Sequence, residues 1–525
     1  MRAATGRRRR TRIASAILVA TTVALGLGAC DSALTAPAGG APVPSATPSG
    51  SASPDDATTP PAPTAEAGPR VVPGPVVLGG DRVAALVPRL AAMRTDGFVV
   101  AARWAVPPGA TAFGETLTAR VAAAVREFAA AHGAAWMPGV DLVAGGASAP
   151  CSGGSAFAAS ASRLSIDCSI VVASGGVIGE RLVTVRAGVG DPTEVAREVW
   201  YADGAGGAPH DGVALYATGS EARVLALVAE ALRAAGRIAP GEDPFARLAP
   251  EVARPLLVDS SAAEVGVVVT LSVPGAERSR PDSVLVPWRL LDPFLSEAGS
   301  LVRSAAVSGG PYEPGSAPAG ADPVDCTLLA CVSLTFDDGP SSLTPALLDV
   351  LDRARAAATF YVQGSSVARH PGTAARAVAA GHEIANHTWA HPDLTKLTDE
   401  QVRDEVRRAQ EAIANATGVR ATSLRPPYGA SNPHVRELVP MPFVVWDIDT
   451  RDWQDPGVEV VVERAVDGAV PGSIVLMHDT HEDTVEAVPA IIDGLRARGV
   501  ALASVEDQFG GSLPGAGALV SHGPR

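Results

Sequence analysis

Five clusters of polar residues in the C-terminal third of the chain have the residue types and the spacing for acid–base and metal-assisted chemistry. Each cluster lies at the end of a short apolar run that is typical of a buried strand. In chain order, the clusters span residues 335–340, 387–391, 425–429, 449–453 and 476–479.

The first cluster contains two adjacent carboxylates, Asp337 and Asp338. Neighbouring side chains on a strand point to opposite faces, so the two carboxylates meet different environments and can take different roles. A plain turn, in which Asp, Gly and Pro merely end the strand, explains the same residues. This cluster alone does not decide between the two interpretations.

The second cluster places His387 and His391 four residues apart. Two such histidines can converge on one ion, and with a carboxylate they form a three-ligand site that leaves a position for water. Thr388 follows His387, so the His-Glu-x-x-His pattern of metalloproteases is absent. Two solvated loop histidines are the alternative interpretation.

The last three clusters add a fixed cation and a candidate acid. Arg425 precedes two prolines, and this stiff turn can present a fixed charge and a backbone N–H to a site. A histidine such as His478 needs an orienting partner to act as an acid near neutral pH, and a carboxylate can supply it. An ordinary proline-rich loop and a surface histidine are the alternatives.

The elements that must position these clusters are short apolar strands alternating with amphipathic helices. The alternation predicts α/β architecture, with parallel strands closed into an incomplete (β/α)7 barrel whose chemistry lies at the carboxyl ends of the strands. Helices are expected over 399–416 and 484–498. The seven expected strands span 332–336, 359–362, 383–385, 423–424, 443–446, 474–477 and 501–505.

Together, the five clusters closely resemble those of the NodB-homology polysaccharide deacetylases of carbohydrate esterase family 4. The resemblance covers 326–511, and nothing before residue 320 takes part in it. It implies that Asp337 is the general base, held by Arg425, and that His478 is the general acid, oriented by Asp452.

The resemblance also implies one divalent metal ion, held by Asp338, His387 and His391. A site of two histidines and one carboxylate suits Zn²⁺ best, although Co²⁺ or another divalent ion is chemically compatible. The backbone N–H of Tyr428 is implied to help bind the oxyanion. The implied substrate-binding residues are Pro427, Trp453 and Leu476, and the last two would form the apolar wall around the acetyl methyl.

The N-terminus has the layout of a bacterial lipoprotein signal. An Arg-rich stretch precedes an apolar run of residues 13–27, and small residues then precede Cys30. We expect a signal peptide over 1–29, lipid attachment at Cys30 and a disordered Pro/Ala/Ser/Thr-rich tether over 30–70, which place the protein outside the cytoplasm on the membrane. A plain secretory signal, with Cys30 incidental, is the alternative.

The other four cysteines allow three pairings, and an oxidising compartment favours disulfides. Sequence proximity favours Cys151 with Cys168 and Cys326 with Cys331. Nucleophilic catalysis by cysteine or serine is not indicated, because the cysteines have other uses and no Gly-x-Ser-x-Gly elbow occurs.

Residues 71–310 mix strand-like and helical runs without a catalytic motif, and we expect a separate α+β accessory domain of unknown role there. Its layout resembles the module ahead of the catalytic domain in some extracellular peptidoglycan deacetylases. A linker at 311–325, the deacetylase domain at 326–511 and a flexible tail at 512–525 complete the expected organisation.

The chain carries 56 acidic and 42 basic residues, for a net charge of −14, and this balance disfavours nucleic acid as a partner. The sequence therefore predicts an exported enzyme that removes N-acetyl groups from N-acetylglucosamine in peptidoglycan. The alternatives are another acetylated polymer, such as chitin oligosaccharide, xylan or a secondary wall polymer, and a non-catalytic sugar-binding or sensing lipoprotein.

Overall fold

The protein is represented by a computed structural model that describes residues 68–140, 151, 162–188, 193–203, 208–273, 280–314 and 320–524. These residues all belong to one compact unit, Ala62–Arg525. The predicted signal peptide, Cys30 and nearly all of the predicted tether lie outside them. No helix among the described residues is long and apolar enough to cross a membrane.

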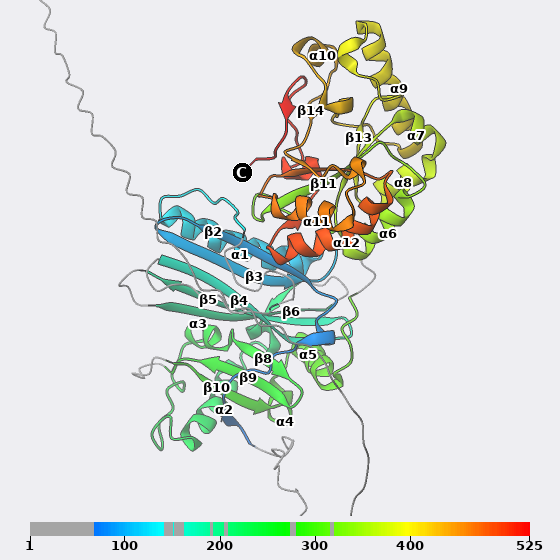
Figure 1. The fold of residues 1–525 in the computed structure, drawn as a ribbon. Coiled ribbons are helices and arrows are strands. Elements are labelled where there is room, and N and C mark those ends of the chain that lie inside the picture. Colours follow the sequence, from blue (N-terminus) through cyan, green and yellow to red (C-terminus); the bar gives the residue numbers. More distant parts are fainter. Residues whose placement is uncertain are drawn as a thin grey trace, which may run out of the picture. The chain divides into compact units, whose positions relative to one another are not determined.

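Two sheets form in the described residues before 310 (Figure 1). One has the order β2-β3-β4-β5-β6-β7 and the other the order β1-β10-β9-β8, and all pairs are antiparallel except β3 with β4. The strands are β1 Arg70–Val72, β2 Val87–Arg94, β3 Phe98–Val106, β4 Ser162–Ser174, β5 Val177–Ala187, β6 Glu194–Asp203, β7 His210–Asp211, β8 Ser260–Ala263, β9 Gly266–Leu271 and β10 Asp282–Pro287.

The helices of this region are α1 Ala112–Ala131, α2 Glu221–Ala234, α3 Pro250–Ala253, α4 Trp288–Leu291 and α5 Glu297–Ser308. The sequence of α1 explains both where this helix begins and which face it buries. Thr111 caps α1 by accepting a hydrogen bond from the Gly114 N–H. Leu117, Val121 and Val125 then recur every four residues and are buried in one core with strand β3.

The residues from 326 form a parallel sheet of order β13-β12-β11-β16-β15, in which β17 also pairs with β11. Its core includes the stacked rings of Phe336 and Phe360. The strands of this region are β11 Cys331–Asp337, β12 Thr359–Val362, β13 Glu383–Asn386, β14 Phe443–Val444, β15 Ile448–Asp449, β16 Ile474–His478, β17 Ala501–Leu502 and β18 Leu519–Val520.

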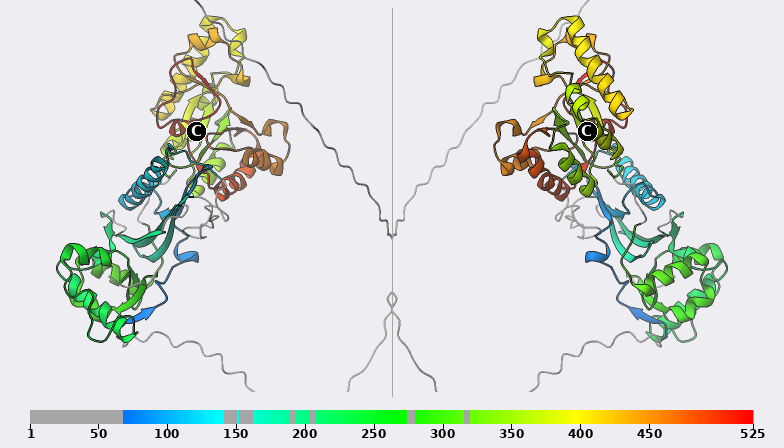
Figure 2. Two further views of the ribbon diagram at one scale, coloured as in Figure 1. Left: turned by 90° about the vertical axis from the view of Figure 1, so that its left-hand side faces the viewer. Right: turned by 90° about the vertical axis from the view of Figure 1, so that its right-hand side faces the viewer.

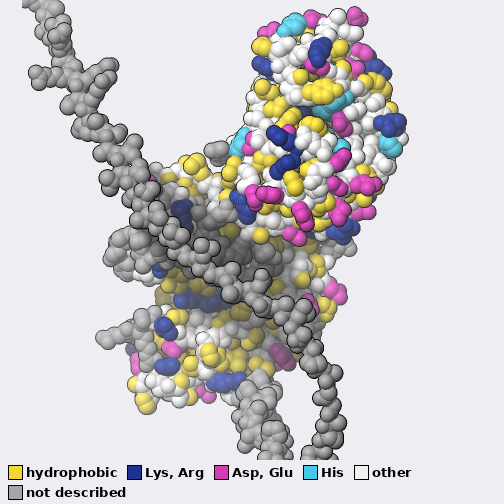
Figure 3. Space-filling view, viewed as in Figure 1, with side chains coloured by type: hydrophobic (Ala, Val, Ile, Leu, Met, Phe, Trp, Pro, Cys, Tyr) yellow, Lys and Arg dark blue, Asp and Glu magenta, His cyan; other side chains and the backbone are white. Residues whose placement is uncertain are grey.

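Helices surround the outside of these parallel strands (Figures 1 and 2). They are α6 Thr344–Ala354, α7 Gly364–Arg369, α8 Pro371–Ala379, α9 Asp399–Thr417, α10 Pro433–Leu438, α11 Val458–Asp467, α12 Glu482–Ala497 and α13 Val505–Gln508. The α/β class is confirmed, whereas closure into an incomplete barrel stays a prediction. On the face drawn in Figure 3, acidic and basic side chains are interspersed over this region.

Two expectations differ from the structure. The strand predicted at 423–424 is reduced to single parallel bridges from Leu424 to Asn386 and Phe443, because the two prolines after Arg425 lack the N–H groups that would extend pairing. The tail predicted to be flexible contains β18, which pairs with β14. This pairing occupies backbone groups that an unpaired β14 edge would expose.

Both disulfides favoured by sequence proximity are present, Cys151–Cys168 and Cys326–Cys331. The second one joins Cys326 to Cys331, the first residue of β11. It therefore closes the short segment through which the chain enters the parallel sheet.

Candidate active site

All five clusters meet at the carboxyl ends of the parallel strands. In the sheet, Asp337 at the end of β11 is the direct register partner of His478 at the end of β16. The chain after β13 then brings His387 and His391 to Asp338. Because parallel strands end at the same edge, residues far apart in sequence form one group.

The candidate metal ligands are Asp338, His387 and His391, whose donor atoms all lie within 4.8 Å of one another. Asp338 Oδ1 is 3.5 Å from Nε2 of each histidine. His387 Nδ1 lies 2.7 Å from the carbonyl oxygen of Arg425. A carbonyl only accepts, so Nδ1 carries the proton and the lone pair of Nε2 faces the other two ligands. This donor set fits a divalent ion such as Zn²⁺.

Backbone strain is concentrated in these clusters. Asp338, Thr388, His391, Tyr428 and Arg451 all have φ between +52° and +77°, a region that non-glycine residues seldom adopt. Such conformations persist when surrounding contacts hold them, and they are typical of functional sites. The loops that carry the clusters are therefore held in place by their packing.

Arg425 is fully buried and fixes Asp337. Its Nη1 donates to Asp337 Oδ1 at 2.7 Å and to Thr335 Oγ1 at 2.8 Å. The guanidinium also lies 3.9 Å from the centre of the Tyr361 ring, a cation–π contact. Asp337 Oδ2, which Arg425 does not bind, lies 3.7 Å from His387 Nε2. One carboxylate oxygen is thus anchored while the other faces the candidate metal ligands.

Asp452 and His478 form the second charged pair. His478 Nδ1 lies 2.8 Å from Asp452 Oδ1, and the His478 backbone N–H donates to Oδ2 at 2.6 Å. The Thr484 hydroxyl donates to Oδ2 as well, at 2.6 Å. Asp452 is fully buried, so the bonds of its carboxylate fix the orientation of the imidazole ring.

The pKa values of His478 and His391 are shifted in opposite directions. Burial lowers the pKa of His478, but the bond to Asp452 and the charges of Asp337 and Asp452 outweigh it and raise this pKa to about 9. Burial and the neighbouring His387 lower the pKa of His391. His478 is therefore an imidazolium at neutral pH, while His391 is the neutral imidazole that metal binding requires.

The candidate substrate-binding residues differ in exposure. Tyr428 is 70% exposed and Trp453 is 52% exposed. The Tyr428 ring lies edge-on to the His391 ring at 4.6 Å, so it borders the candidate metal ligands. Pro427 and Leu476 are buried.

Several supporting residues are given no role in the sequence predictions, although one of them, Asp479, lies in the fifth cluster. Gln363 Nε2 donates to Asp338 Oδ1 at 2.8 Å, and its position directly after the predicted strand 359–362 is a signal that could have found it. Asp479 is buried against Gly339, where an added Cβ would lie 2.2 Å from its carboxylate, and the Thr344 hydroxyl donates to it. No sequence pattern marks these last contacts.

Comparisons with known proteins match the part of the chain that carries the candidate metal ligands. A family model described as polysaccharide deacetylase matches residues 326–440. A peptidoglycan-N-acetylglucosamine deacetylase of Listeria monocytogenes is 39% identical over 183 residues, which are 35% of this chain and 39% of that protein. The chain thus spans about two fifths of the length of that curated relative.

A chitooligosaccharide deacetylase of Rhizobium leguminosarum is 40% identical over 192 residues, covering 33% of this chain and 89% of that protein. A solved structure of the Bacillus subtilis peptidoglycan deacetylase PdaC is 36% identical, with a TM-score of 0.34, and the match covers 35% of this chain and 91% of that one. A TM-score of this size carries no argument about the fold.

Proposed function

We propose that this chain, which belongs to the polysaccharide deacetylase family, is a metal-dependent hydrolase of N-acetyl groups in cell-wall glycan, with N-acetylglucosamine of peptidoglycan as its substrate. One observation carries the proposal. The Asp338, His387 and His391 donor atoms converge beside two separately held groups, the Asp337 carboxylate and the His478 imidazole.

Amide hydrolysis needs an activated water, a stabilised oxyanion and a proton for the departing amine. A divalent ion bound by Asp338, His387 and His391 would polarise the acetyl carbonyl and lower the pKa of a water. In the proposed mechanism Asp337 takes the proton from that water, and the ion pair with Arg425 keeps the Asp337 carboxylate oriented.

His478 supplies the proton to the departing nitrogen. It is charged at neutral pH and held by Asp452 at both its ring and its backbone. The Tyr428 N–H stabilises the oxyanion. Trp453 and Leu476 border the acetyl methyl, and Pro427 belongs to the same wall.

The rest of the chain fits an enzyme of the cell surface. We propose a signal peptide over 1–29, a lipid anchor at Cys30 and a tether over 30–70, all from the sequence. The 71–310 accessory domain and the 326–511 deacetylase domain would follow on the outer face of the membrane. The curated relative from Listeria is a peptidoglycan deacetylase, which supports the cell's own wall as the substrate.

The test is acetate release by the purified protein from three defined polymers: peptidoglycan glycan strands, chitooligosaccharides and acetylated xylan. We expect acetate from glycan strands, and little from xylan. Acetate from xylan with none from glycan strands would overturn the proposed substrate. The Asp337→Asn protein serves as the control for contaminating esterases.

A chitin-like oligosaccharide is the second candidate substrate. The Rhizobium relative, a chitooligosaccharide deacetylase, supports it, because this chain covers 89% of that protein. Faster release from chitooligosaccharides than from glycan strands would favour this candidate.

A further inference from the structure

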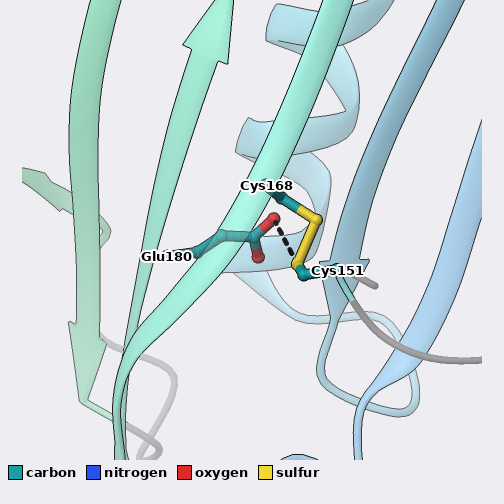
Figure 4. Close-up of side chains that lie close together, drawn as sticks. All are labelled: Cys151, Cys168 and Glu180. Atoms are coloured by element: carbon teal, nitrogen blue, oxygen red, sulfur yellow. Dashed lines mark hydrogen bonds between the residues drawn. A yellow bond between two sulfur atoms is a disulfide. The ribbon is translucent and has the colours of Figure 1, made fainter. Parts of the chain in front are cut away.

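A second cluster of reactive side chains lies far along the chain from the candidate active site, with one member on β4, one on β5 and one before β4. It consists of the Cys151–Cys168 disulfide and Glu180 (Figure 4). Both sulfurs and a Glu180 carboxylate oxygen lie within 4.8 Å of one another. The sulfurs are joined to each other, so they are not thiolate ligands for a metal ion in this state.

Glu180 is an unusual neighbour for a disulfide because its side chain is fully buried. Its Oε1 accepts one hydrogen bond, from the Ala105 N–H at 3.0 Å, and lies 3.8 Å from Cys151 Sγ. Its Oε2 is buried and has no hydrogen-bond partner among the described residues. An ionised carboxylate with a single donor would be costly in such a place.

Burial raises the pKa of Glu180 to about 8, against the opposing effect of the Ala105 N–H. The carboxyl is therefore protonated at neutral pH and holds a proton beside the two sulfurs. A disulfide sulfur carries no hydrogen, so within this cluster only Glu180 can donate a proton. Its carboxyl oxygen lies within 4.8 Å of both sulfurs, Cys168 Sγ included.

We propose that Glu180 is the proton donor to the thiolate released when a dithiol reductant opens the Cys151–Cys168 bond, which makes this cluster a thiol–disulfide exchange site. Cys151 is half-buried whereas Cys168 is buried, so the reductant reaches Cys151 first. Exchange rates depend on access and on how readily the leaving sulfur departs.

In the first step a thiolate of the reductant bonds to Cys151 Sγ, the Cys151–Cys168 bond breaks, and its electron pair goes to Cys168 Sγ. Glu180 transfers its proton to that sulfur and later regains one from solvent. In the second step the other thiolate of the reductant displaces Cys151, which takes a proton from solvent. The protein disulfide is reduced to two thiols, and the dithiol is oxidised to a disulfide.

The test compares the two disulfides within the same molecule. The full-length protein and its Glu180→Gln variant are treated with dithiothreitol at pH 7, quenched by alkylation and mapped by mass spectrometry. Glutamine keeps an acceptor for the Ala105 N–H but has no acidic proton. We expect reduction of Cys151–Cys168 to slow at least ~10-fold, as for loss of a general acid, while reduction of Cys326–Cys331 keeps its rate.

Equal rates for Cys151–Cys168 in the two proteins would overturn the proposal. A second measurement needs no variant. In D₂O, reduction of Cys151–Cys168 should slow more than reduction of Cys326–Cys331, because a proton is transferred in the first case. Equal slowing of the two disulfides would contradict the proposed role of Glu180.

Discussion

Asp452 holds His478 at two points, with Oδ1 at 2.8 Å from the ring Nδ1 and Oδ2 accepting from the backbone N–H at 2.6 Å. The two contacts fix both the tautomer and the direction of the ring. His478 Nε2 is therefore the atom that can present a proton to a substrate.

Asp452→Asn should shift the pH dependence of acetate release. The pKa of His478 is raised to about 9, so the imidazolium exists below that pH and is lost as the pH rises through it. Without the Asp452 charge the pKa falls, and the alkaline loss of activity moves to lower pH. We also expect kcat at neutral pH to fall at least ~10-fold.

The matched control for this variant is Asp455→Asn. Asp455 pairs with the His481 ring at 3.2 Å in a similar arrangement but is exposed. Its loss should leave the pH profile unchanged. An unchanged alkaline limb in Asp452→Asn would contradict the assignment of His478 as the acid.

Gln363→Leu should weaken metal binding by ~10–100-fold, the usual cost of losing a partner that orients a ligand. Its amide donates to the same Asp338 oxygen that faces both histidines. Competition with a chromophoric chelator measures the affinity for Zn²⁺ directly. Gln401→Leu is the control, because it removes a helix-capping bond to Thr398 and leaves the ligands untouched. Equal affinities in the two variants would refute this role of Gln363.

Arg425→Leu should lower the free energy of unfolding by about 3 kcal/mol, because it leaves the buried Asp337 carboxylate without its partner. Urea denaturation measures the change. Arg408→Leu provides the comparison, since Arg408 is only half-buried and stacks on Trp389. This substitution should lower the free energy of unfolding by about 1 kcal/mol or less. Similar losses of unfolding free energy in the two variants would mean that burial of the Arg425–Asp337 ion pair does not increase its effect on stability.

Metal removal should abolish acetate release, and Zn²⁺ should restore it. His387→Ala should lose both the metal and the activity, because His387 is one of the three ligands. His434→Ala should keep both, since His434 pairs with Asp399 on the surface. Full activity after exhaustive chelation, with no residual metal by elemental analysis, would exclude a metal-dependent mechanism.

The sequence predicts which candidate site residues lie together better than it predicts the side chains that support them. Asp337, Asp338 and His478 were found because each ends an apolar strand, and the structure places them at one sheet edge. The strand expected at 423–424 is reduced to single bridges at Leu424, and the tail expected to be flexible contains the paired strand β18. Pairing in both places depends on neighbouring segments rather than on local composition.

The supporting contacts that the sequence does not predict share one property: the two partners lie far apart in the chain. Thr484 binds Asp452 from within helix α12, and Glu180 reaches the Ala105 N–H from another strand. A single polar residue in an apolar run carries no signal of its partner when that partner lies tens of residues away. Such contacts can be identified only once the helices and strands are placed in three dimensions.

The most direct test of the central claim measures metal content and acetate release in Asp337→Asn, with peptidoglycan glycan strands as the substrate. The variant should keep one metal ion per chain, since Asp338, His387 and His391 remain, while its turnover falls at least ~100-fold. Full turnover by the metal-loaded variant would contradict the account, because Asp337 would then not be the base.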